Sequence, residues 1–485
     1  MHKMGFERGF IEFARVEPEH QDVAVRIRHF DEFIKTYDDK TAINQAGRCM
    51  DCGIPFCTRV CPLHNVMPEI NQAVCEGNFE KAYKIVSMSN NFPEITGRIC
   101  PALCEDGCTL SLTDKSVSIK AIERKISEYA FSHGLVGVFK PERNTNKHVA
   151  IVGSGPAALA CAQELTRLGN HVTVYEKNSK IGGLLRFGIP DFKFSKSLID
   201  RRLSQMEQEG VKFIVNTMVG KKEDLGEGVH CEATNFISGQ SLTKQYDAVV
   251  LCPGSEQPRD LKIPGRELKG IYFALDFLIA QNKENDGEVT NPIDVKGKKV
   301  VVIGGGETAS DCIGTAIRKG ASSVTQLDYH DELPEHVDPH CGFPYYKKIK
   351  RTSTSQQEGC TRIFSTNTTS FEGEGKVSSI RTVKVKWGPN RKITPIEGTQ
   401  GQMDADIVLI AMGYAHPSLS LVNEFKLKTD SRGNIAAPTD GENAYKTSCD
   451  KVFAAGDGRK GQSLVVYAIA EGRQCAYAVN RYLNH

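Results

Sequence analysis

The sequence predicts an α/β protein with two Rossmann-like nucleotide-binding units that follow an α-helical, cysteine-rich domain. Two glycine-rich turns, near residues 153 and 304, each connect an apolar strand-like run to a helical run. Seven of the sixteen cysteines form two tight groups between residues 49 and 108, ahead of both turns. A chain of 485 residues is too long for one ordinary core, so we expect roughly two to four domains.

Composition and charge exclude several classes of protein. The chain has 61 basic and 59 acidic residues, and a net charge of +2 gives no field that would attract nucleic acid. No run of about eighteen apolar residues is present, so we expect neither a transmembrane helix nor a membrane partner. The first twenty residues lack the apolar core of a signal peptide. Together with the many cysteines, this predicts a cytoplasmic protein.

The cysteines form two closely spaced groups. The first contains Cys49, Cys52, Cys57 and Cys61, and the second contains Cys100, Cys104 and Cys108. Such short gaps allow several thiolates to converge on one small inorganic centre. A disulfide framework is typical of small secreted chains and is disfavoured here.

Two kinds of metal centre fit the cysteine spacing to different degrees. Structural zinc usually uses pairs of CxxC, and only Cys49 and Cys52 form one. An iron–sulfur cluster often takes three close cysteines and a distant fourth, which favours Cys49, Cys52 and Cys57 with one ligand from the second group. Seven cysteines cannot fill the eight places of two clusters. Either one cluster has a non-cysteine ligand, or the second centre is of another type.

The segments around the cysteines are predicted to be helical. Residues 23–35 form an amphipathic stretch, and residues 67–90 read as two short helices separated by Gly77. Residues 116–131 place isoleucines at helical spacing. A polar stretch with a proline, at residues 137–148, then marks a domain boundary.

The first glycine turn is a complete dinucleotide fingerprint. Gly153 permits the tight turn, Gly155 allows a pyrophosphate to approach the backbone, and Ala158 lets the helix pack on the strand. The pyrophosphate would lie at the helix N-terminus. The second strand ends at Glu176, whose carboxylate would accept hydrogen bonds from a ribose.

A second fingerprint begins at Lys298. Gly304, Gly306 and Ala309 occupy the three turn positions, and the second strand ends near Asp328. Two nucleotide folds in one chain suggest two nucleotides. A flavin and a nicotinamide are the simplest pair, because hydride passes directly between rings that stack within roughly 3–3.5 Å.

Other segments complete this plan. Residues 245–255 and 404–414 are predicted to be buried strands, and the glycines at 373 and 375 mark a hairpin. Residues 332–350 contain irregularly spaced histidines, which favours a solvated loop over a metal site. Near the C-terminus a strand, a turn with Asp457 and a helix follow one another. That acid either binds a ribityl hydroxyl or belongs to a surface turn.

Long motifs in this chain resemble one family. RCMDCGIPFC, ICPALCEDGC, VGSGPAALACAQEL, GGLLRFGIPDFK, GGGETASDC and VFAAGDGRKGQSLVVYAIAEGR together resemble the small (β) subunit of glutamate synthase, whose modules also form the N-terminal half of dihydropyrimidine dehydrogenase. The resemblance covers nearly the whole chain in unchanged order. It implies a helical domain with two [4Fe–4S] clusters at residues 1–140, an FAD-binding domain at 141–275 and 413–485, and an NAD(P)H-binding domain at 276–412.

The resemblance also implies ligands for the clusters. One cluster would be held by Cys49, Cys52, Cys57 and Cys108, and the other by Cys61, Cys100 and Cys104. In similar proteins a Glu or Gln on the following helix supplies the eighth ligand, and Glu123 has that place here. The alternative is that Glu123 is an exposed helix acid.

The nucleotide contacts follow from the same resemblance. The FAD pyrophosphate would lie at Gly153, Gly155, Pro156, Ala157 and Ala158, with Glu176 on the ribose. The flavin would be surrounded by Gly183, Leu184, Arg186, Gly456, Asp457 and Ser463, and the nicotinamide nucleotide would meet Gly304, Gly306, Glu307, Thr308 and Asp328. No acid–base residue is required, because hydride passes directly between the cofactors.

The end of the second fingerprint departs from relatives that use NADPH, which commonly carry a basic residue there. This chain has Asp328, Asp331 and Glu332 instead. An acid at that place favours a free 2′-hydroxyl and repels a 2′-phosphate. The basic residues at 347–351 would compensate only if they folded back, so the expected nucleotide is NADPH or, as the alternative, NADH.

The implied activity is an electron-input oxidoreductase for glutamate biosynthesis. NAD(P)H would reduce FAD, and the clusters would pass electrons to a large (α) subunit that makes glutamate. Nothing in this chain resembles a glutamine amidotransferase or an FMN barrel. The enzyme alternative is a stand-alone oxidoreductase that serves ferredoxin or another acceptor, and the non-catalytic alternative is a zinc-bearing scaffold.

Overall fold

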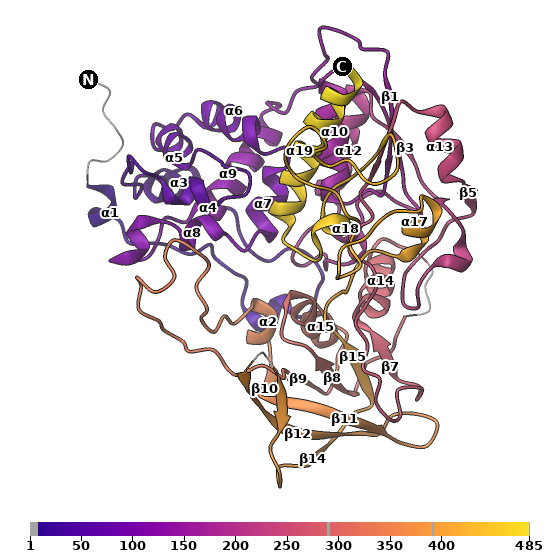
Figure 1. Ribbon diagram of the computed structural model, residues 1–485. Coiled ribbons are helices and arrows are strands. Elements are labelled where there is room, and N and C mark those ends of the chain that lie inside the picture. The colour runs from indigo at the N-terminus through magenta and orange to yellow at the C-terminus, as the bar shows by residue number, and fades with distance from the viewer. Residues whose placement is uncertain (1–7, 289–291, 390–391, 485) are drawn as a thin grey trace.

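The computed structural model describes residues 8–288, 292–389 and 392–484. The first seven residues, part of the segment examined for a signal peptide, lie outside these ranges. Figure 1 shows a helical domain beside two α/β units, with the C-terminal helix packed into the unit nearest to it. No helix within the described ranges has the length and apolarity needed to cross a membrane.

The helical domain surrounds the cysteines. Its elements are α1 (Gly9–Glu12), α2 (Val23–Arg26), α3 (Asp39–Ala46), α4 (Phe56–Val60), α5 (Met67–Cys75), α6 (Phe79–Ser89), α7 (Pro93–Ile99), α8 (Leu103–Asp106), η1 (Thr109–Leu112) and α9 (Ile119–Ser132). The predicted pair of helices separated by Gly77 is confirmed, because α5 ends at Cys75 and α6 begins at Phe79. The helix predicted near residue 120 is also present.

The prediction of a helix through residues 23–35 is wrong beyond Arg26. The segment does not continue as a helix because its side chains contact both α/β units. Arg26 donates to Glu358 at 2.7 Å, and the rings of Phe30 and Phe33 both lie 6.4 Å from the ring of Phe192. Contacts to separate partners therefore replace the single helical face that the apolar spacing indicated.

The first nucleotide unit contains a parallel five-stranded sheet of order β16-β6-β1-β2-β3. Its strands are β1 (His148–Val152), β2 (His171–Tyr175), β3 (Lys212–Ile214), β6 (Ala248–Leu251) and β16 (Val452–Ala454). Its helices are α10 (Pro156–Arg167), α11 (Leu184–Phe187), α12 (Ser197–Glu209), α13 (Gly239–Gln245), α17 (Leu419–Glu424), α18 (Asp457–Lys460) and α19 (Val465–Asn484), with η2 (Lys222–Asp224) and the small pair β4 (Thr217–Val219) and β5 (Asn235–Ile237). The C-terminal strand β16 thus joins a sheet whose other strands all come from residues 148–251.

The second nucleotide unit lies within the sequence of the first. Its parallel sheet has the order β10-β9-β8-β15-β7 and contains β7 (Ile271–Phe273), β8 (Lys299–Ile303), β9 (Ser323–Leu327), β10 (Cys360–Ile363) and β15 (Ile407–Ile410). The helices are α14 (Ala274–Asn285), α15 (Glu307–Arg318) and α16 (Thr354–Gln357), and an antiparallel sheet contains β11 (Thr366–Glu372), β12 (Ser379–Trp387), β13 (Ile393–Pro395) and β14 (Gly401–Asp404). The predicted hairpin is confirmed by the antiparallel pairing of β11 with β12. Residues 332–350 form a loop, as predicted.

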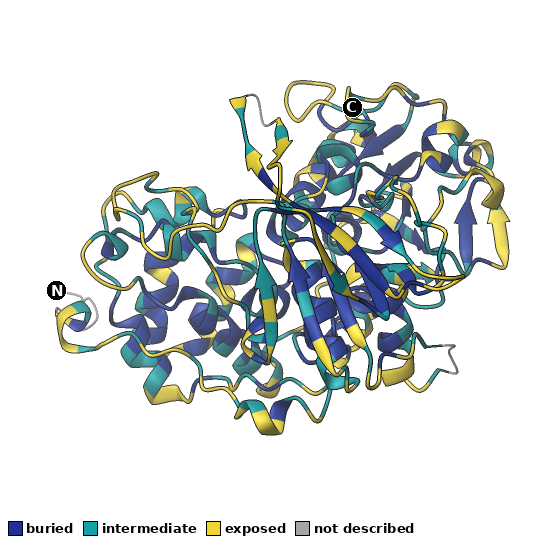
Figure 2. Cartoon of the chain, turned by 90° about the horizontal axis from the view of Figure 1, so that it is seen from below, coloured by how far each residue is buried: buried dark blue, intermediate teal, exposed yellow. Residues whose placement is uncertain are grey.

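The core consists of strands that are apolar throughout. Residues 149–152 of β1 and 407–410 of β15 are buried, because helices and loops cover both faces of their sheets. Figure 2 shows these strands as a buried centre with exposed residues on the outer helices and loops. The glycine turns follow the carboxyl ends of these parallel strands, so the packing around the strands holds the turns in place.

Candidate functional site

The first glycine turn leaves room for a ligand at the start of α10. Gly153 has φ +98°, and a β-carbon there would lie 2.4 Å from the carbonyl oxygen of Cys252. At Gly155 an added β-carbon would meet nothing within 4 Å. Because Gly155 precedes the first residue of α10 and no side chain caps that helix, its first amides are free to bind an anion.

A large cavity runs along this turn. It holds about 1270 Å³ of empty space, counted out to its open mouth. Of the predicted residues it is lined by Gly153, Gly155, Pro156, Ala157, Glu176, Gly183, Leu184 and Asp457. The cavity adjoins the N-terminus of α10, where the pyrophosphate of a dinucleotide would bind.

Glu176 is fixed at one part of the cavity wall. Its carboxylate accepts from the Ser154 hydroxyl at 2.5 Å and from the backbone N–H of Asn178 at 2.9 Å. Burial raises the pKa of this carboxyl, and the two hydrogen bonds oppose that rise. The side chain is thus oriented before any ribose arrives.

Asp457 lies at the first position of α18. Its carboxylate accepts from the Ser463 hydroxyl at 2.5 Å, and burial raises its pKa. Gly456, just before it, has φ +73°, and a β-carbon there would lie 2.7 Å from Cβ of Ala157. Asp457 therefore lines the same cavity as the first glycine turn, and its carboxylate is bonded to Ser463.

Some predicted flavin contacts do not line the cavity. Arg186 is buried, donates to the carbonyl of Ile181 at 2.7 Å, and pairs with Asp200. Ala158, Gly456 and Ser463 also lie outside the cavity lining. Sequence reasoning missed other lining residues. Phe187 lies within the GGLLRFGIPDFK motif, whereas Tyr175, Asn178, Met218, His230 and Leu421 belong to none of the motifs quoted above.

The second glycine turn has the same form, with Asp328 above it. Gly304 has φ +138°, and a β-carbon there would lie 2.2 Å from the carbonyl oxygen of Ala411. Space beside Gly306 is open, and α15 begins at Glu307, followed by Thr308. The Asp328 carboxylate accepts from the backbone N–H of His330 at 3.0 Å and contacts its Nδ1 at 2.8 Å.

The nearby basic residues do not fold back onto Asp328. Lys350 pairs with Glu332 at 2.6 Å. Arg351 pairs with Asp106 of the helical domain at 2.8 Å, and the backbone N–H of Lys347 donates to the same carboxylate at 3.3 Å. These contacts hold the loop against α8, so the compensation considered from the sequence does not occur through these three residues.

Lys193 connects the two nucleotide units. Its ammonium lies 2.7 Å from the Asp311 carboxylate, 3.0 Å from the Ser310 hydroxyl and 3.5 Å from the Glu307 carboxylate. It lies in the loop that follows Gly183, and its three partners lie on the first turns of α15. The loop after Gly183 and the start of α15 are therefore in direct contact.

Four of the cysteines line one small cavity in the helical domain. They are Cys49, Cys52, Cys57 and Cys108. Burial raises the pKa of Cys49 to about 11 and that of Cys57 to about 12, and the charge of Cys108 raises both further. The distant cysteine therefore joins the first group, as the resemblance implied.

The other three cysteines gather with Glu123. Burial raises the pKa of Cys61, Cys100 and Cys104, and the Glu123 charge raises each of them further. Glu123 is only 8% exposed, so the alternative of an exposed helix acid is wrong. Burial raises its pKa to about 7, although it accepts hydrogen bonds from Asn90 at 2.7 Å and from Thr96.

Both groups are suited to a positively charged centre. Thiols whose pKa is raised by burial, as in Cys49, Cys57 and Cys100, would release their protons on binding a cation. All sixteen cysteines of the described chain are free. No three of its His, Cys, Asp and Glu side chains gather around a single-ion site. Ligands of an iron–sulfur cluster stand farther apart, because iron and sulfide lie between them.

Comparisons with known proteins agree with this arrangement. Residues 147–472 match the family described as pyridine nucleotide-disulphide oxidoreductase, and residues 26–135 match dihydropyrimidine dehydrogenase domain II, 4Fe-4S cluster. The crystal structure of FprA from Mycobacterium tuberculosis (His57Gln mutant) has a TM-score of 0.52 at 20% identity, covering 70% of this chain and 85% of that one. At that identity the match supports the fold alone, and the predicted α/β class is confirmed.

Full-length relatives define the family. The chain is 43% identical to the glutamate synthase [NADPH] small chain of Mycobacterium tuberculosis, over 98% of this chain and 95% of that one. The Bacillus subtilis glutamate synthase [NADPH] small chain is 37% identical over 99% of both. Saccharomyces cerevisiae glutamate synthase [NADH] is 38% identical, over 98% of this chain and 22% of its own length. The resemblance seen in the motifs is therefore confirmed, and the chain is an oxidoreductase that belongs to the glutamate synthase small-chain family.

Proposed function

We propose that this chain takes hydride from a nicotinamide nucleotide onto FAD and passes the electrons, through two [4Fe–4S] clusters, to a glutamate-forming large subunit. One observation carries the proposal. The eight candidate ligands fall into two sets of four, with Cys108 in the first set and Glu123 in the second. A zinc-bearing scaffold would not require two such sets of ligands beside a dinucleotide-binding cavity.

Residues of the first nucleotide unit would hold FAD. The amides after Gly155 would bind the pyrophosphate, Glu176 the adenosine ribose and Asp457 the ribityl chain. The division of the chain at residues 140, 275 and 412 belongs to the same proposal. It is supported by the pairing of β16 with β6, which returns the C-terminal segment to the first sheet.

Residues around each cluster site would neutralise and orient its ligands. When bound, the flavin would accept a hydride, which carries two electrons, and the clusters would carry those electrons one at a time. Asn90 and Thr96 donate to Glu123 and fix the direction of its carboxylate. The backbone N–H of Ala102 donates to the Cys100 sulfur at 3.4 Å, and such hydrogen bonds favour the thiolate form of a ligand.

We propose NADH as the preferred nucleotide, although relatives named for NADPH and for NADH both match the chain. The Asp328 carboxylate lies over the glycine turn, where it would accept hydrogen bonds from a ribose diol and repel a 2′-phosphate. Lys350 and Arg351 are held by other acids. No lysine or arginine is thus shown at this carboxylate in the described part of the chain.

We propose a separate large subunit as the electron acceptor, and the cytoplasm as the location. The yeast relative is a single polypeptide of which this chain matches 22%, whereas the bacterial small chains match along their whole length. A reducing compartment would keep the many free thiols available for cluster assembly. Ferredoxin as the acceptor remains the alternative outcome of the tests.

Chemical analysis of the purified protein tests this assignment. The proposal expects one flavin and about eight iron atoms per chain, with equal sulfide. Cys108→Ser and Cys104→Ser should each remove about four iron atoms, from different clusters, and leave the flavin bound. Zinc in place of iron would contradict the proposal. Co-expression with the large-subunit gene of the same organism should yield a complex, and its absence would favour the ferredoxin alternative.

A further inference from the structure

The helical domain is joined to the first nucleotide unit by a buried ion pair. Glu94 of α7 accepts two hydrogen bonds from the Arg202 guanidinium of α12, at 2.7 and 3.0 Å. The two side chains are 0% and 3% exposed. The guanidinium also lies 5.6 Å from the ring centre of Phe92 and 5.1 Å from that of Phe131. A charge so completely buried is stable only with its partner in place.

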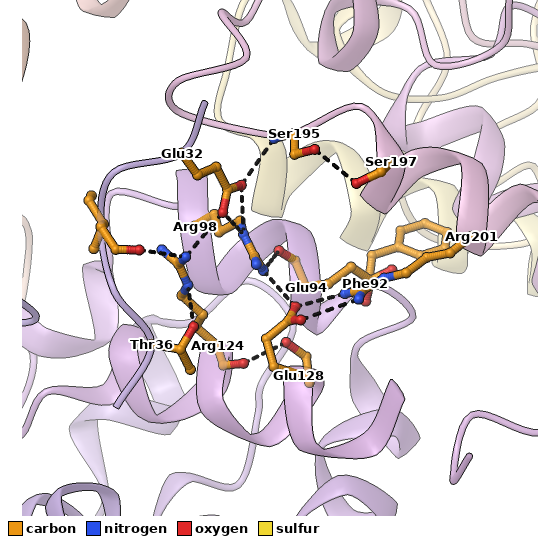
Figure 3. Close-up of polar contacts among 12 residues, drawn as sticks. Glu32, Thr36, Phe92, Glu94, Arg98, Arg124, Glu128, Ser195, Ser197 and Arg201 are labelled. Carbon is orange, nitrogen blue, oxygen red and sulfur yellow. Dashed lines mark hydrogen bonds and ion pairs between the residues drawn. The ribbon is translucent and has the colours of Figure 1, made fainter. Parts of the chain in front are cut away.

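A second group of ion pairs crosses the same interface, as Figure 3 shows. Glu128 of α9 accepts from Arg98 at 3.0 Å and from Arg201 of α12 at 2.7 Å. Glu32 accepts from Arg98 at 2.9 Å and also from the backbone N–H of Ser195 at 3.0 Å. The helical domain is therefore tied to α12 and to the loop before it at several neighbouring points.

These contacts join two helices whose chain segments lead to the two candidate cofactor sites. On one side, α7 ends directly before Cys100, so any movement of α7 moves a candidate cluster ligand. On the other side, α12 follows the loop that begins at Gly183 in the flavin cavity. The pair of Glu94 and Arg202 thus connects the helix that ends at the second cluster site with the helix that follows the flavin loop.

Such an ion pair fixes the relative position of two helices, which apolar packing does not do. Well-packed apolar residues of similar volume give equal or greater stability than a buried ion pair. A two-point hydrogen bond, however, fixes distance and angle, while apolar surfaces can slide. Electron transfer slows steeply with distance, so a small shift of α7 against α12 would be costly for a step between these sites.

We propose that Glu94 and Arg202 are positioning residues that hold the second cluster site at a fixed distance from the flavin and so set the rate of electron transfer between them. The inference rests on the proposed function. In each step one electron leaves the reduced flavin and one oxidised cluster gains it. The nicotinamide nucleotide supplies the electrons, and no covalent bond changes in this step.

The test compares two matched double variants of the full chain. Glu94→Gln with Arg202→Gln removes both charges at the interface; Gln matches Glu in size and is smaller than Arg. Arg167→Gln with Glu209→Gln removes another pair on α12, at 2.8 Å, that lies within the first nucleotide unit. Anaerobic stopped-flow absorbance with NADH follows flavin bleaching and cluster reduction separately.

The interface variant should bleach its flavin within twofold of the wild-type rate and reduce its clusters at least tenfold more slowly, with unchanged iron, flavin and cluster potential. Hydrogen exchange in α7 should rise. The control variant should reduce its clusters at the wild-type rate. Cluster reduction at the wild-type rate in the interface variant would overturn the inference, as would equal slowing in the control.

Two further results keep the test decisive. If the interface variant loses iron, Arg202→Lys is tested in its place. Lysine keeps the charge but cannot form the two-point hydrogen bond. Cluster reduction at the wild-type rate in Arg202→Lys would overturn the inference. Failure of the wild-type protein itself to bleach flavin or reduce clusters would instead contradict the proposed function.

Discussion

The carboxylate of Asp328 lies where a side chain on Gly305 would begin: a β-carbon at Gly305 would be 1.8 Å from Oδ2. The acid at the end of β9 therefore touches the glycine turn that precedes α15. His330 holds it there from the following residues and stacks on Trp387, with ring centres 5.3 Å apart. This contact places a negative charge beside the expected ribose.

Replacing Asp328 by Ser should change the nucleotide preference. We expect kcat/KM for NADH to fall ~10- to 100-fold, because charged hydrogen bonds contribute about 1.5–3 kcal/mol, and the value for NADPH to rise. The control is Asp331→Ser, which removes a nearby acid bonded to Ser365. Steady-state assays with both nucleotides check this, and an unchanged ratio in Asp328→Ser would show that Asp328 does not contact the ribose.

Replacing Glu123 by Ala should remove one cluster and leave FAD bound. The iron content should fall from about eight to about four atoms per chain, because the second set would keep only three ligands. Glu80→Ala, on the exposed side of α6, serves as the control. Iron analysis and the flavin absorbance decide the outcome, and full iron content in Glu123→Ala would mean that this carboxylate ligates nothing.

Replacing Gly97 by Ala should disturb the second cluster site indirectly, through the packing of α7 on α9. A β-carbon at Gly97 would lie 2.6 Å from the backbone N of Arg124, so α7 and α9 would have to separate. We expect a loss of about 1–3 kcal/mol of stability and less iron in the second site. At Gly137 an added β-carbon meets nothing within 4 Å, so Gly137→Ala should match the wild type in thermal unfolding and iron content.

The pH dependence of stability should contain a contribution from His230. Burial, then the charges of Lys283 and Lys177, lower its pKa from 6.5 to about 4. Between these values the unfolded chain binds the extra proton, so stability is lost as pH falls from about 6.5 to 4.

Because His230 is a third exposed, we expect a loss of no more than about 2 kcal/mol. Urea denaturation of the flavin-free protein at pH 4.5 and 7 should show a smaller acid loss in His230→Gln. An equal loss in both proteins would count against a lowered pKa.

Much of this molecule could be predicted from its sequence, because the informative features are local. The glycine turns, the helix pair around Gly77 and the grouping of cysteines depend on residues close together in the chain. The predicted helix past Arg26 failed because Phe33 packs on Phe192, more than a hundred residues away. No hydrophobic periodicity or motif in the sequence predicts such a contact.

The same reason explains what was missed at the site. His230, Leu421 and Met218 reach the cavity from three separate segments, and each looks like an ordinary surface or core residue in the sequence. Likewise, Glu94 and Arg202 stand 108 positions apart. Arg186 belongs to a recognisable motif, yet its guanidinium binds its own loop through the carbonyl of Ile181.

The central claim is that hydride enters at the flavin and leaves as single electrons through the clusters. Anaerobic stopped-flow absorbance of the purified protein, mixed with NADH or NADPH and with iron and flavin measured on the same sample, tests it most directly. We predict rapid flavin bleaching, faster with NADH, followed by slower cluster reduction. Absence of bleaching with both nucleotides, in protein that contains flavin, would contradict the account.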